Sequence, residues 1–311
     1  MEQRGTSNTI DVLGLGAVAI DDLLYVDQYP PAESKTRVCR RERQCGGQTG
    51  TALVAAARFG AKAAYAGQLG NDVLSQEVIE NFANERIETC WAPTSEKARP
   101  AHSTIIVDET AKTRTIFAFV DGDLGPAPNR PEPSIIQSSQ ILLIDHHGIE
   151  GSLRAARVAR KANRPVVADF ERAGEDPFQE LLQVVDHLIV SLQFATEVTG
   201  ESNPQRAAAS LATSERCLVA VTCGDDGCYY WVKEEPDQVL HQPAFRVEVA
   251  DTTGCGDVFH GVYAAALSRA MTPGACIRNA TAAAALKASH RGGQAGIPRR
   301  EAVDQFLAEQ L

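Results

Sequence analysis

The 311-residue sequence lacks several features that would define a protein class at once. No apolar run reaches the length of about 18 residues that a membrane-spanning helix needs, so we expect none. Its eight cysteines include no C-x-x-C pair, which argues against a zinc site and, in a reducing compartment, against disulfides. The N-terminal segment has no apolar core typical of a secretory signal, so we expect a cytoplasmic protein. Without a G-x-x-x-x-G-K-[ST] string, a P-loop nucleotide hydrolase is excluded.

Positive charge is also scarce, because 30 Lys and Arg stand against 40 Asp and Glu, a formal net charge of −10. Such a surface repels phosphate backbones and anionic lipid, and we expect neither a nucleic-acid nor a membrane partner. Aromatic residues make up only 6%, but the hydrophobic share of 44% is ordinary for a globular protein. A small anion can still bind where local backbone amides outweigh the distant net charge.

Strand-like and helix-like segments alternate along most of the chain. The expected strands are 10–20, 63–69, 141–145, 165–169, 187–191 and 217–222, and the expected helices are 51–59, 73–86, 152–162, 178–185 and 203–213. Repeated β-α-β units with short connections predict a doubly wound, mostly parallel sheet with helices on both faces. We therefore expect one α/β domain over residues 1–311, with ligands at the carboxyl ends of the strands.

Two stretches depart from this alternation. Residues 103–119 contain two strand-like runs around a polar turn, which predicts a hairpin. Extended chain also occurs between residues 22 and 44, and pairing it with the hairpin would give a small β-sheet lid. We expect this lid over about 22–44 and 101–120. Because an unpaired sheet edge tends to find a partner, it also predicts a homodimer through the lid.

The strongest chemical signal is the string ADTTGCGD at residues 250–257, followed by a helix rich in small residues. Free backbone N–H groups at a helix start, together with the helix dipole, can hold a phosphoryl group. Asp257, beside that group, is positioned to accept a hydroxyl proton, which makes Asp257, Gly254, Cys255 and Gly256 the catalytic candidates. The alternative is that Asp257 only caps the helix.

The D-T-x-G-x-G-D pattern within this string resembles the PfkB, or ribokinase-like, family of sugar and nucleoside kinases. Gly46 and Gly47, with the segment 67–72, resemble the family's other motif, and the likeness spans Gly14 to Pro298. Segments 241–245, 257–261 and 292–298 look most like sulfofructose kinase, and 16–30 resembles ketohexokinase. The resemblance implies a ribokinase-like fold and ATP-dependent phosphorylation of a sugar hydroxyl, on a ketose or related small polyol. It also implies Mg²⁺ as a cofactor, with K⁺ as a further candidate.

The same resemblance implies roles for individual residues. Asp257 would be the base, and the amides around Gly254, Cys255 and Gly256 would form the anion hole. Substrate-binding candidates are Asp21, Gly46, Gly47, Thr51 and His147. Nucleotide-binding candidates are Thr222, Gly224, Gly227, Asn279 and Ala283. Candidates for a monovalent cation are Asp251 and Thr253.

Three departures from the family pattern bear on these roles. The frequent Asn-x-x-Glu is replaced by SLQF at 191–194, which cannot bind metal in the same way, so we expect Asp169 and Glu171 as metal ligands instead. Thr51 stands where ribokinases have an asparagine. His146 and His147 stand where sulfofructose kinase has an arginine. Histidine is largely neutral at pH 7, so these residues favour an acceptor other than a sulfonate.

Three other functions stay open at this point. A dinucleotide enzyme is suggested by Gly14, Gly16 and Ala19 in a G-x-G-x-x-A pattern, but extended chain follows where a helix is needed. A pseudokinase would explain the missing Asn-x-x-Glu, although the intact Asp257 and anion hole oppose it, and a nucleoside kinase of the same family is a further alternative. Cys255, where the family usually has alanine, is either a reactive thiol at a helix start or a tolerated small residue.

Overall fold

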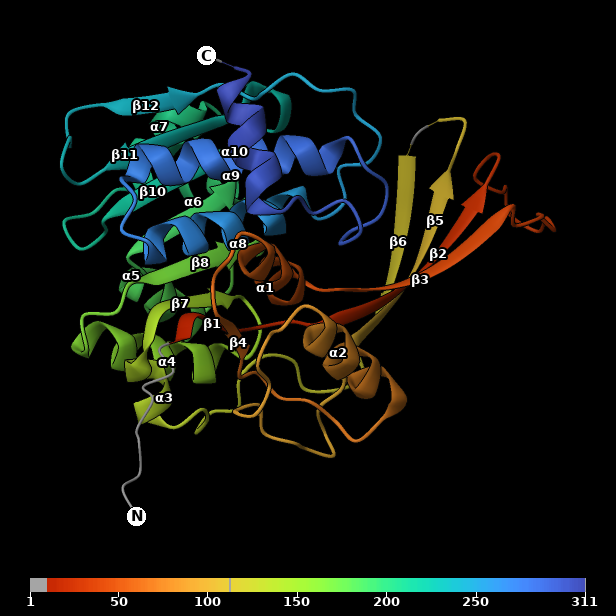
Figure 1. Cartoon of the computed structure of the whole chain (residues 1–311), viewed down its shortest axis with the longest axis horizontal. Coiled ribbons are helices and arrows are strands. Elements are labelled where there is room, and N and C mark those ends of the chain that lie inside the picture. Colours follow the sequence, from red (N-terminus) through yellow and green to blue (C-terminus); the bar gives the residue numbers. More distant parts are fainter. Residues whose placement is uncertain (1–9, 112, 311) are drawn as a thin grey trace.

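The computed structural model describes residues 10–111 and 113–310; residues 1–9, where a signal peptide would begin, lie outside them. Eight strands form one twisted sheet (Figure 1) in the order β12-β11-β10-β9-β8-β7-β1-β4. They are β1 (Ile10–Leu15), β4 (Ala63–Tyr65), β7 (Ser139–Asp145), β8 (Val166–Phe170), β9 (His187–Ser191), β10 (Leu218–Thr222), β11 (Cys228–Val232) and β12 (Val239–Gln242). Only the pairs β10–β11 and β11–β12 are antiparallel, so the expected mostly parallel sheet is confirmed.

Helices cover both faces of this sheet because successive side chains of a strand point to opposite sides. In β7, Ile141 and Leu143 pack in one core layer and Leu142 and Ile144 in the other. The first layer is covered by α1 (Gln48–Arg58), α2 (Val73–Asn84), α8 (Cys255–Ser268), α9 (Pro273–Ala288) and α10 (Arg300–Ala308). The second is covered by α3 (Pro133–Ser138), α4 (Ile149–Lys161), α5 (Phe178–Val184), α6 (Leu192–Thr199) and α7 (Pro204–Leu211). None of the helices in the described ranges is both long and apolar enough to cross a membrane.

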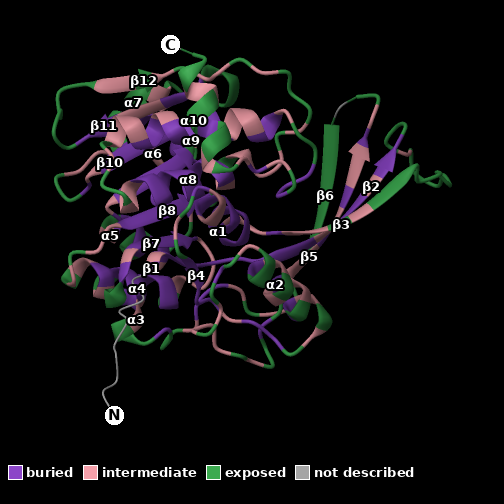
Figure 2. Cartoon of the chain, in the orientation of Figure 1, coloured by how far each residue is buried: buried purple, intermediate pink, exposed green. Residues whose placement is uncertain are grey.

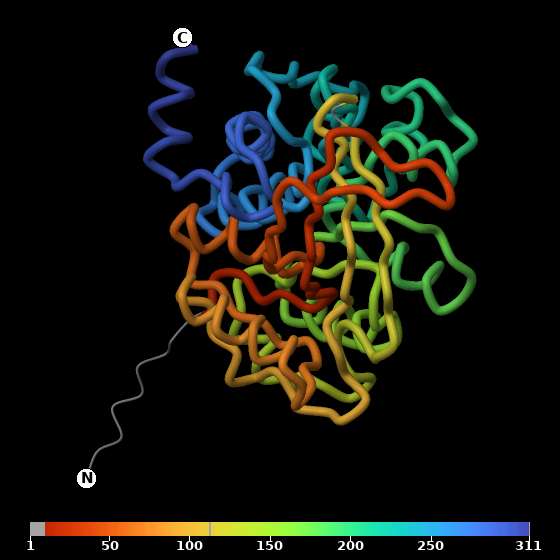
Figure 3. The backbone as a smooth tube through the Cα atoms, turned by 90° about the vertical axis from the view of Figure 1, so that its right-hand side faces the viewer, coloured from red at the N-terminus to blue at the C-terminus, as the bar shows by residue number. Residues whose placement is uncertain are grey.

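The lid is a separate four-stranded sheet in the order β3-β2-β5-β6, with strands β2 (Ala19–Val26), β3 (Arg40–Gly46), β5 (Ala101–Asp108) and β6 (Thr113–Phe119). The expected hairpin is the antiparallel pair β5–β6, and β2 joins it through a parallel pairing with β5. Figure 3 looks onto this sheet, which forms a layer of its own in front of the body. All seven residues of β6 are exposed, as the green strand in Figure 2 shows.

One expected strand is wrong, because residues 10–20 form two strands in two different sheets. The chain leaves β1 at Leu15, and the backbone N–H of Ala17 donates to Asp145 Oδ2 at 2.7 Å, which turns the chain toward the lid. A Cβ on Gly16 would lie 2.1 Å from the same oxygen, so only glycine fits there. Because β2 rather than a helix follows Gly16, the dinucleotide reading is excluded.

Candidate active site

The first turn of α8 forms the centre of the site. Gly254 precedes it in a left-handed conformation with φ of 76°, which suits glycine. The amides of Gly256 and Asp257 have no acceptor within the helix, and a Cβ on Gly256 would meet no atom within 4 Å, so a ligand can approach this backbone closely. The amide of Cys255, which we expected in the anion hole, already donates to Thr252 O at 3.2 Å and is therefore less available to bind an anion.

A cavity of about 540 Å³ lies against this helix start. Three of the nucleotide-binding candidates line it: Thr222 at the end of β10, and Gly224 and Gly227 in the following turn. Further walls come from residues 244–247, Val249 and α9. On α9 the lining residues are Thr281, Ala284, Ala285 and Ala288, which share one helical face. The mostly apolar walls with a few polar groups are typical of a small-molecule site.

The structure does not bring Asn279 and Ala283 to this cavity. Both lie on α9, but on a different face from the lining residues: Asn279 Nδ2 donates to the Ala275 carbonyl of its own helix at 2.8 Å, and Ala283 is fully buried. Thr281, between them, does line the cavity, so the expected segment reaches it although these two side chains do not. The period of an apolar, alanine-rich helix does not say which side meets a ligand.

Asp257 lies among carboxylates. Burial raises its pKa well above the ordinary value, and the charges of Asp169, Glu171, Asp145 and Asp21 raise it further. Its side chain keeps partial solvent access. The predicted base, the predicted acceptor ligand Asp21 and both predicted metal ligands are thus close enough to interact electrostatically. A carboxyl group with a raised pKa is a better proton acceptor, provided it is ionised when the acceptor binds.

Asp169, at the end of β8, pairs with a residue that the sequence did not indicate. His260 Nδ1 lies 3.3 Å from Asp169 Oδ2 and 2.8 Å from Gly256 O, and its Nε2 lies 3.0 Å from Ile189 O. Each ring nitrogen therefore faces oxygen acceptors and is positioned to donate. Burial raises the pKa of Asp169 to about 6, and the charge of His260 acts in the opposite direction. His260 fixes the first turn of α8 to the sheet.

The acceptor-binding candidates lie where the lid joins the body. A Cβ on Gly46 would be 2.4 Å from Asp21 Oδ2, so glycine at 46 makes room for that carboxylate. Burial raises the pKa of Asp21, and a hydrogen bond from Ser103 works against the shift. Gly47 has φ of 83°, and a Cβ there would lie 2.6 Å from Val18 Cα. Thr51 is buried, and Gln294 Nε2 lies 3.4 Å from its hydroxyl.

His147 is occupied by a neighbouring carboxylate. Its backbone N–H donates to Asp145 Oδ1 at 2.8 Å, and its Nδ1 lies 3.2 Å from the same atom. Burial alone would lower the pKa of His147, but the hydrogen bond and charge of Asp145 outweigh it and the pKa is raised. Burial lowers the pKa of His146 to about 4, and its Nδ1 is buried without a hydrogen-bond partner. The pair therefore offers one neutral ring and one ring held by Asp145.

Asp251 and Thr253, the two residues expected at a monovalent cation site, are hydrogen-bonded to each other. Asp251 Oδ1 accepts from the Thr253 N–H at 2.8 Å and from its hydroxyl at 2.7 Å, and Oδ2 accepts from the Gly292 N–H at 2.9 Å. Cys255, the possible reactive thiol, lies 3.5 Å from Ala284 O. Burial raises its pKa to about 11, because desolvation outweighs the effect of the helix start, and this favours the tolerated small residue over the reactive thiol.

No group of three or more His, Cys, Asp or Glu side chains is arranged to hold a metal ion among residues 10–111 and 113–310. The closely placed carboxylates Asp169 and Glu171 still suit Mg²⁺, because a cation would relieve the mutual repulsion that raises the pKa of Asp169. Oxygen ligands of this kind, shared with the phosphates of a nucleotide, fit the way proteins bind this ion.

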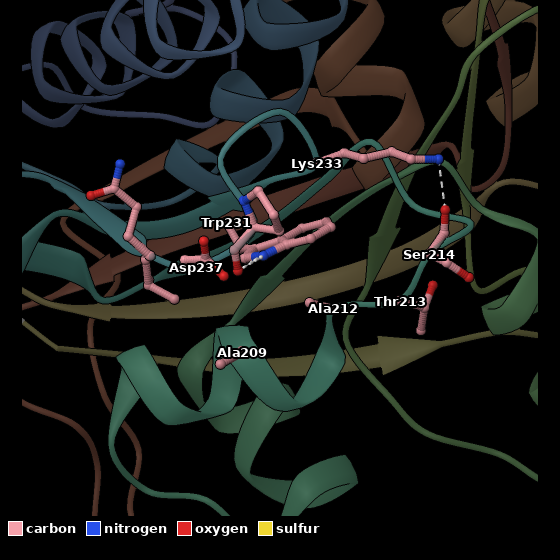
Figure 4. Close-up of a pocket in the computed structure, with 10 residues that line it drawn as sticks. Ala209, Ala212, Thr213, Ser214, Trp231, Lys233 and Asp237 are labelled. Carbon is pink, nitrogen blue, oxygen red and sulfur yellow. Dashed lines mark hydrogen bonds between the residues drawn. The ribbon is translucent and has the colours of Figure 1, made fainter.

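Two further cavities have different surroundings. One of about 660 Å³ lies between the lid residues Leu23, Tyr25, Ile105 and Val107 and the loop 248–253, beside the site. Another of about 530 Å³ lies at the far sheet edge between α7 and β11 (Figure 4). There Lys233 Nζ donates to Ser214 O at 2.7 Å and Trp231 Nε1 to Pro236 O at 3.0 Å, so these two donors already have partners.

The lid sheet over the carboxyl ends of a parallel sheet places the fold in the ribokinase-like class. The model for the pfkB family carbohydrate kinases matches residues 10–300, so the chain belongs to this family of phosphotransferases and is a carbohydrate kinase.

Three similar proteins are also sugar kinases by name. A ribokinase of Haemophilus influenzae is 27% identical, covering 94% of this chain and 97% of that protein. A deoxyribokinase of Salmonella typhi is 24% identical, covering 96% of this chain and 99% of its own length. The crystal structure of a putative ribokinase from Agrobacterium tumefaciens has a TM-score of 0.89 and 28% identity, covering 97% and 99%. The likeness of single segments to sulfofructose kinase and ketohexokinase stays a prediction.

Proposed function

We propose that this kinase transfers the γ-phosphoryl group of ATP to a hydroxyl of a small neutral sugar. The observation that carries the proposal is the start of α8, where Gly256 lines the 540 Å³ cavity and Asp257, the next residue, is close enough to the acceptor candidate Asp21 for the two charges to interact. An anion-binding turn with a carboxylate of raised pKa is what phosphoryl transfer to an alcohol requires.

In this proposal ATP occupies the cavity lined by Thr222, Gly224 and Gly227, with its phosphates toward Gly256. The acceptor lies beneath the lid, held by Asp21 and the backbone at Gly46 and Gly47. Asp257 takes the hydroxyl proton as the oxygen attacks in line. The amides at the start of α8 stabilise the developing charge, each good donor contributing about 3 to 4 kcal/mol. Mg²⁺, held by the phosphates with Asp169 and Glu171, would neutralise charge on the transferring group.

The acceptor follows from the charge of the site. Carboxylates gather around Asp257, and they would repel a phosphorylated or sulfonated sugar. A neutral pentose, as the names of the relatives suggest, or a neutral ketose fits this field. His146, whose Nδ1 is buried and unpaired, is a free polar group for a sugar hydroxyl.

We also propose that the lid closes over the acceptor and supports a homodimer. Closing contacts are already formed: Arg291 Nη1 lies 3.1 Å from Glu109 Oε1, and Arg114 Nη1 lies 3.3 Å from Thr252 Oγ1. The exposed apolar side chains Ile116, Phe117 and Phe119 of β6 would be covered in a dimer. All eight cysteines are free thiols, which supports a reducing compartment such as the cytoplasm.

A coupled ADP-release screen tests the proposal. The acceptors are ribose, deoxyribose, fructose, sulfofructose, fructose phosphates, 2-keto-3-deoxygluconate and nucleosides, each with Mg²⁺ and ATP. We expect turnover with a neutral sugar and little with the anionic ones. Turnover only with nucleosides would support the nucleoside kinase instead. Tight nucleotide binding without transfer to any acceptor would point to a pseudokinase.

A further inference from the structure

Lys287 is a fully buried lysine near the end of α9, within the apolar sequence Ala280–Ala288. Its ammonium donates to the backbone carbonyl of Asp251 at 2.9 Å and lies 3.4 Å from that of His290. Within the described residues it forms no ion pair at 4.0 Å or closer. The positive charge therefore lies against backbone oxygens, and the carboxylates of Asp251 and, more weakly, Asp257 act on it from further away.

Such an arrangement is costly unless something compensates it, since burying an unpaired ammonium costs several kcal/mol. Part of the compensation is local, because Lys287 is in the last turn of α9, where the helix dipole is negative. Burial lowers the pKa of Lys287, and the charge of Asp251 works against that shift. Two backbone carbonyls accept from the ammonium and so stabilise it, while its burial acts against the charge.

The carbonyl that Lys287 holds belongs to the loop in front of α8. Every polar group of Asp251 is engaged: its N–H donates to Ala288 O at 3.0 Å, its carboxylate accepts from Thr253 and Gly292, and its carbonyl accepts from Lys287. Gly254 and the phosphate-binding amides of α8 follow directly. A change at Lys287 would therefore shift the loop that presents those amides.

This geometry also disagrees with a K⁺ ion at Asp251 and Thr253. Such an ion needs several oxygen atoms free to replace its water shell, as rings of carbonyls do in potassium channels. Here the Asp251 carbonyl is taken by an ammonium, and Oδ1 already accepts two hydrogen bonds from Thr253. The ligands expected for a monovalent cation are occupied, and the charge that the ion would bring is supplied by the chain.

We propose that Lys287 is a positioning residue that acts as a built-in monovalent cation: it fixes the Asp251–Gly254 loop, adds positive charge behind the phosphate-binding amides, and makes the kinase independent of K⁺. The inference rests on the proposed phosphoryl transfer at Asp257. The charge of Lys287 reaches both Cys255 and Asp257 at the start of α8, which is where a phosphoryl anion would lie.

The test compares the wild type with Lys287→Ala in buffers whose ionic strength is kept constant with tetramethylammonium chloride, while K⁺, Rb⁺ or NH₄⁺ is titrated. The wild type should not respond. Lys287→Ala should lose about tenfold to a hundredfold in kcat, the effect of a misplaced catalytic loop, and should regain at least part of it with K⁺ or NH₄⁺. Lys287→Met, which fills the space, should be equally slow and not rescued.

Lys161→Ala is the matched control, because Lys161 is also in the last turn of a helix but is exposed, and it should behave as the wild type. Thermal unfolding gives a readout without turnover: K⁺ should raise the Tm of Lys287→Ala and leave that of the wild type unchanged. If the wild type has no kinase activity, the proposed function fails, whereas these Tm shifts still test Lys287. Severalfold activation of the wild type by K⁺ would overturn the inference, and so would full activity of Lys287→Ala without K⁺, Rb⁺ or NH₄⁺. The response of the wild type can be measured even if the variant does not fold.

Discussion

Replacing Asp257 with asparagine tests the chemistry of the site most directly. The change keeps the size of the side chain and removes the atom that would take the proton. Loss of a positioned general base typically slows turnover about 10²- to 10⁴-fold, equivalent to roughly 3 to 5 kcal/mol of barrier. Nucleotide affinity should stay the same or rise, because the variant removes one negative charge from a cluster of carboxylates beside the phosphates.

The pH dependence carries further information. Burial and Asp169 raise the pKa of Asp257, so wild-type turnover should increase with pH through that raised value and then level off. Because the two carboxyl groups interact, the observed midpoint belongs to the pair and should lie above the usual carboxyl range. This acid limb should be absent from the residual activity of the asparagine variant.

The same variant should be more stable than the wild type at neutral pH. A group whose folded-state pKa is raised binds more protons in the folded than in the unfolded protein, so its presence reduces stability as pH rises from the unfolded pKa through the folded one. Asparagine removes this penalty. The Tm of Asp257→Asn should therefore exceed that of the wild type at pH 7, and the difference should shrink toward pH 4.

Single-turnover ADP formation gives the rate, and isothermal titration with ATP gives the affinity. Asp304→Asn, at an exposed position on α10, serves as the control and should leave both unchanged. A loss smaller than about tenfold, with the acid limb retained, would contradict the role of Asp257 as base. A loss of ATP affinity equal to the loss in rate would point to a structural role at the helix start.

Three other substitutions follow from the geometry. Gly46→Ala should raise the acceptor KM about tenfold or more, because its Cβ would lie 2.4 Å from Asp21 Oδ2 and a shift of this size misplaces the acceptor; ATP affinity measured alongside should not change. Asp145→Ala should lower stability by about 3 to 5 kcal/mol in urea denaturation, since it leaves buried donors unpaired on three chain segments, and a cost below about 1 kcal/mol would contradict this. Cys255→Ala should keep kcat within about twofold of the wild type, because the thiol is protonated at its raised pKa; a tenfold loss would restore a chemical role for it.

Much of the fold is predictable because buried parallel strands are short apolar runs between turns. The strands at 141–145, 187–191 and 217–222 and the hairpin in 103–119 were expected close to their observed bounds. The prediction of a single strand over residues 10–20 fails because a tertiary contact ends the first strand. Nothing local distinguishes Gly16 and Ala17 from the apolar run around them, and the bond from Ala17 to Asp145 that splits it joins residues 128 apart.

The site is predictable to the extent that its chemistry is carried by one continuous string. Residues 250–257 place Asp257 and its amides together on any backbone that forms a helix there, and the turn at Thr222 to Gly227 is similarly local. Roles that depend on the facing of a helix are less secure, as Asn279 and Ala283 show. A helix that is buried on several sides has no distinct polar face, so its sequence does not predict which face contacts a ligand.

Lys287 and His260 show what the sequence can and cannot predict about buried polar residues. Both are charged or polar residues with small or apolar neighbours on either side in the sequence, at ALKAS (285–289) and DVFHG (257–261). Because a buried polar group must find a partner, each such residue predicts an interaction, although not its identity. The partners come from distant segments: Asp251 is 36 residues from Lys287, and Ile189 is 71 residues from His260. Both interactions hold the chain around the start of α8, Lys287 through the Asp251 carbonyl and His260 through that of Gly256, so two isolated polar residues on helices that pack on each other fix the turn that carries the proposed chemistry.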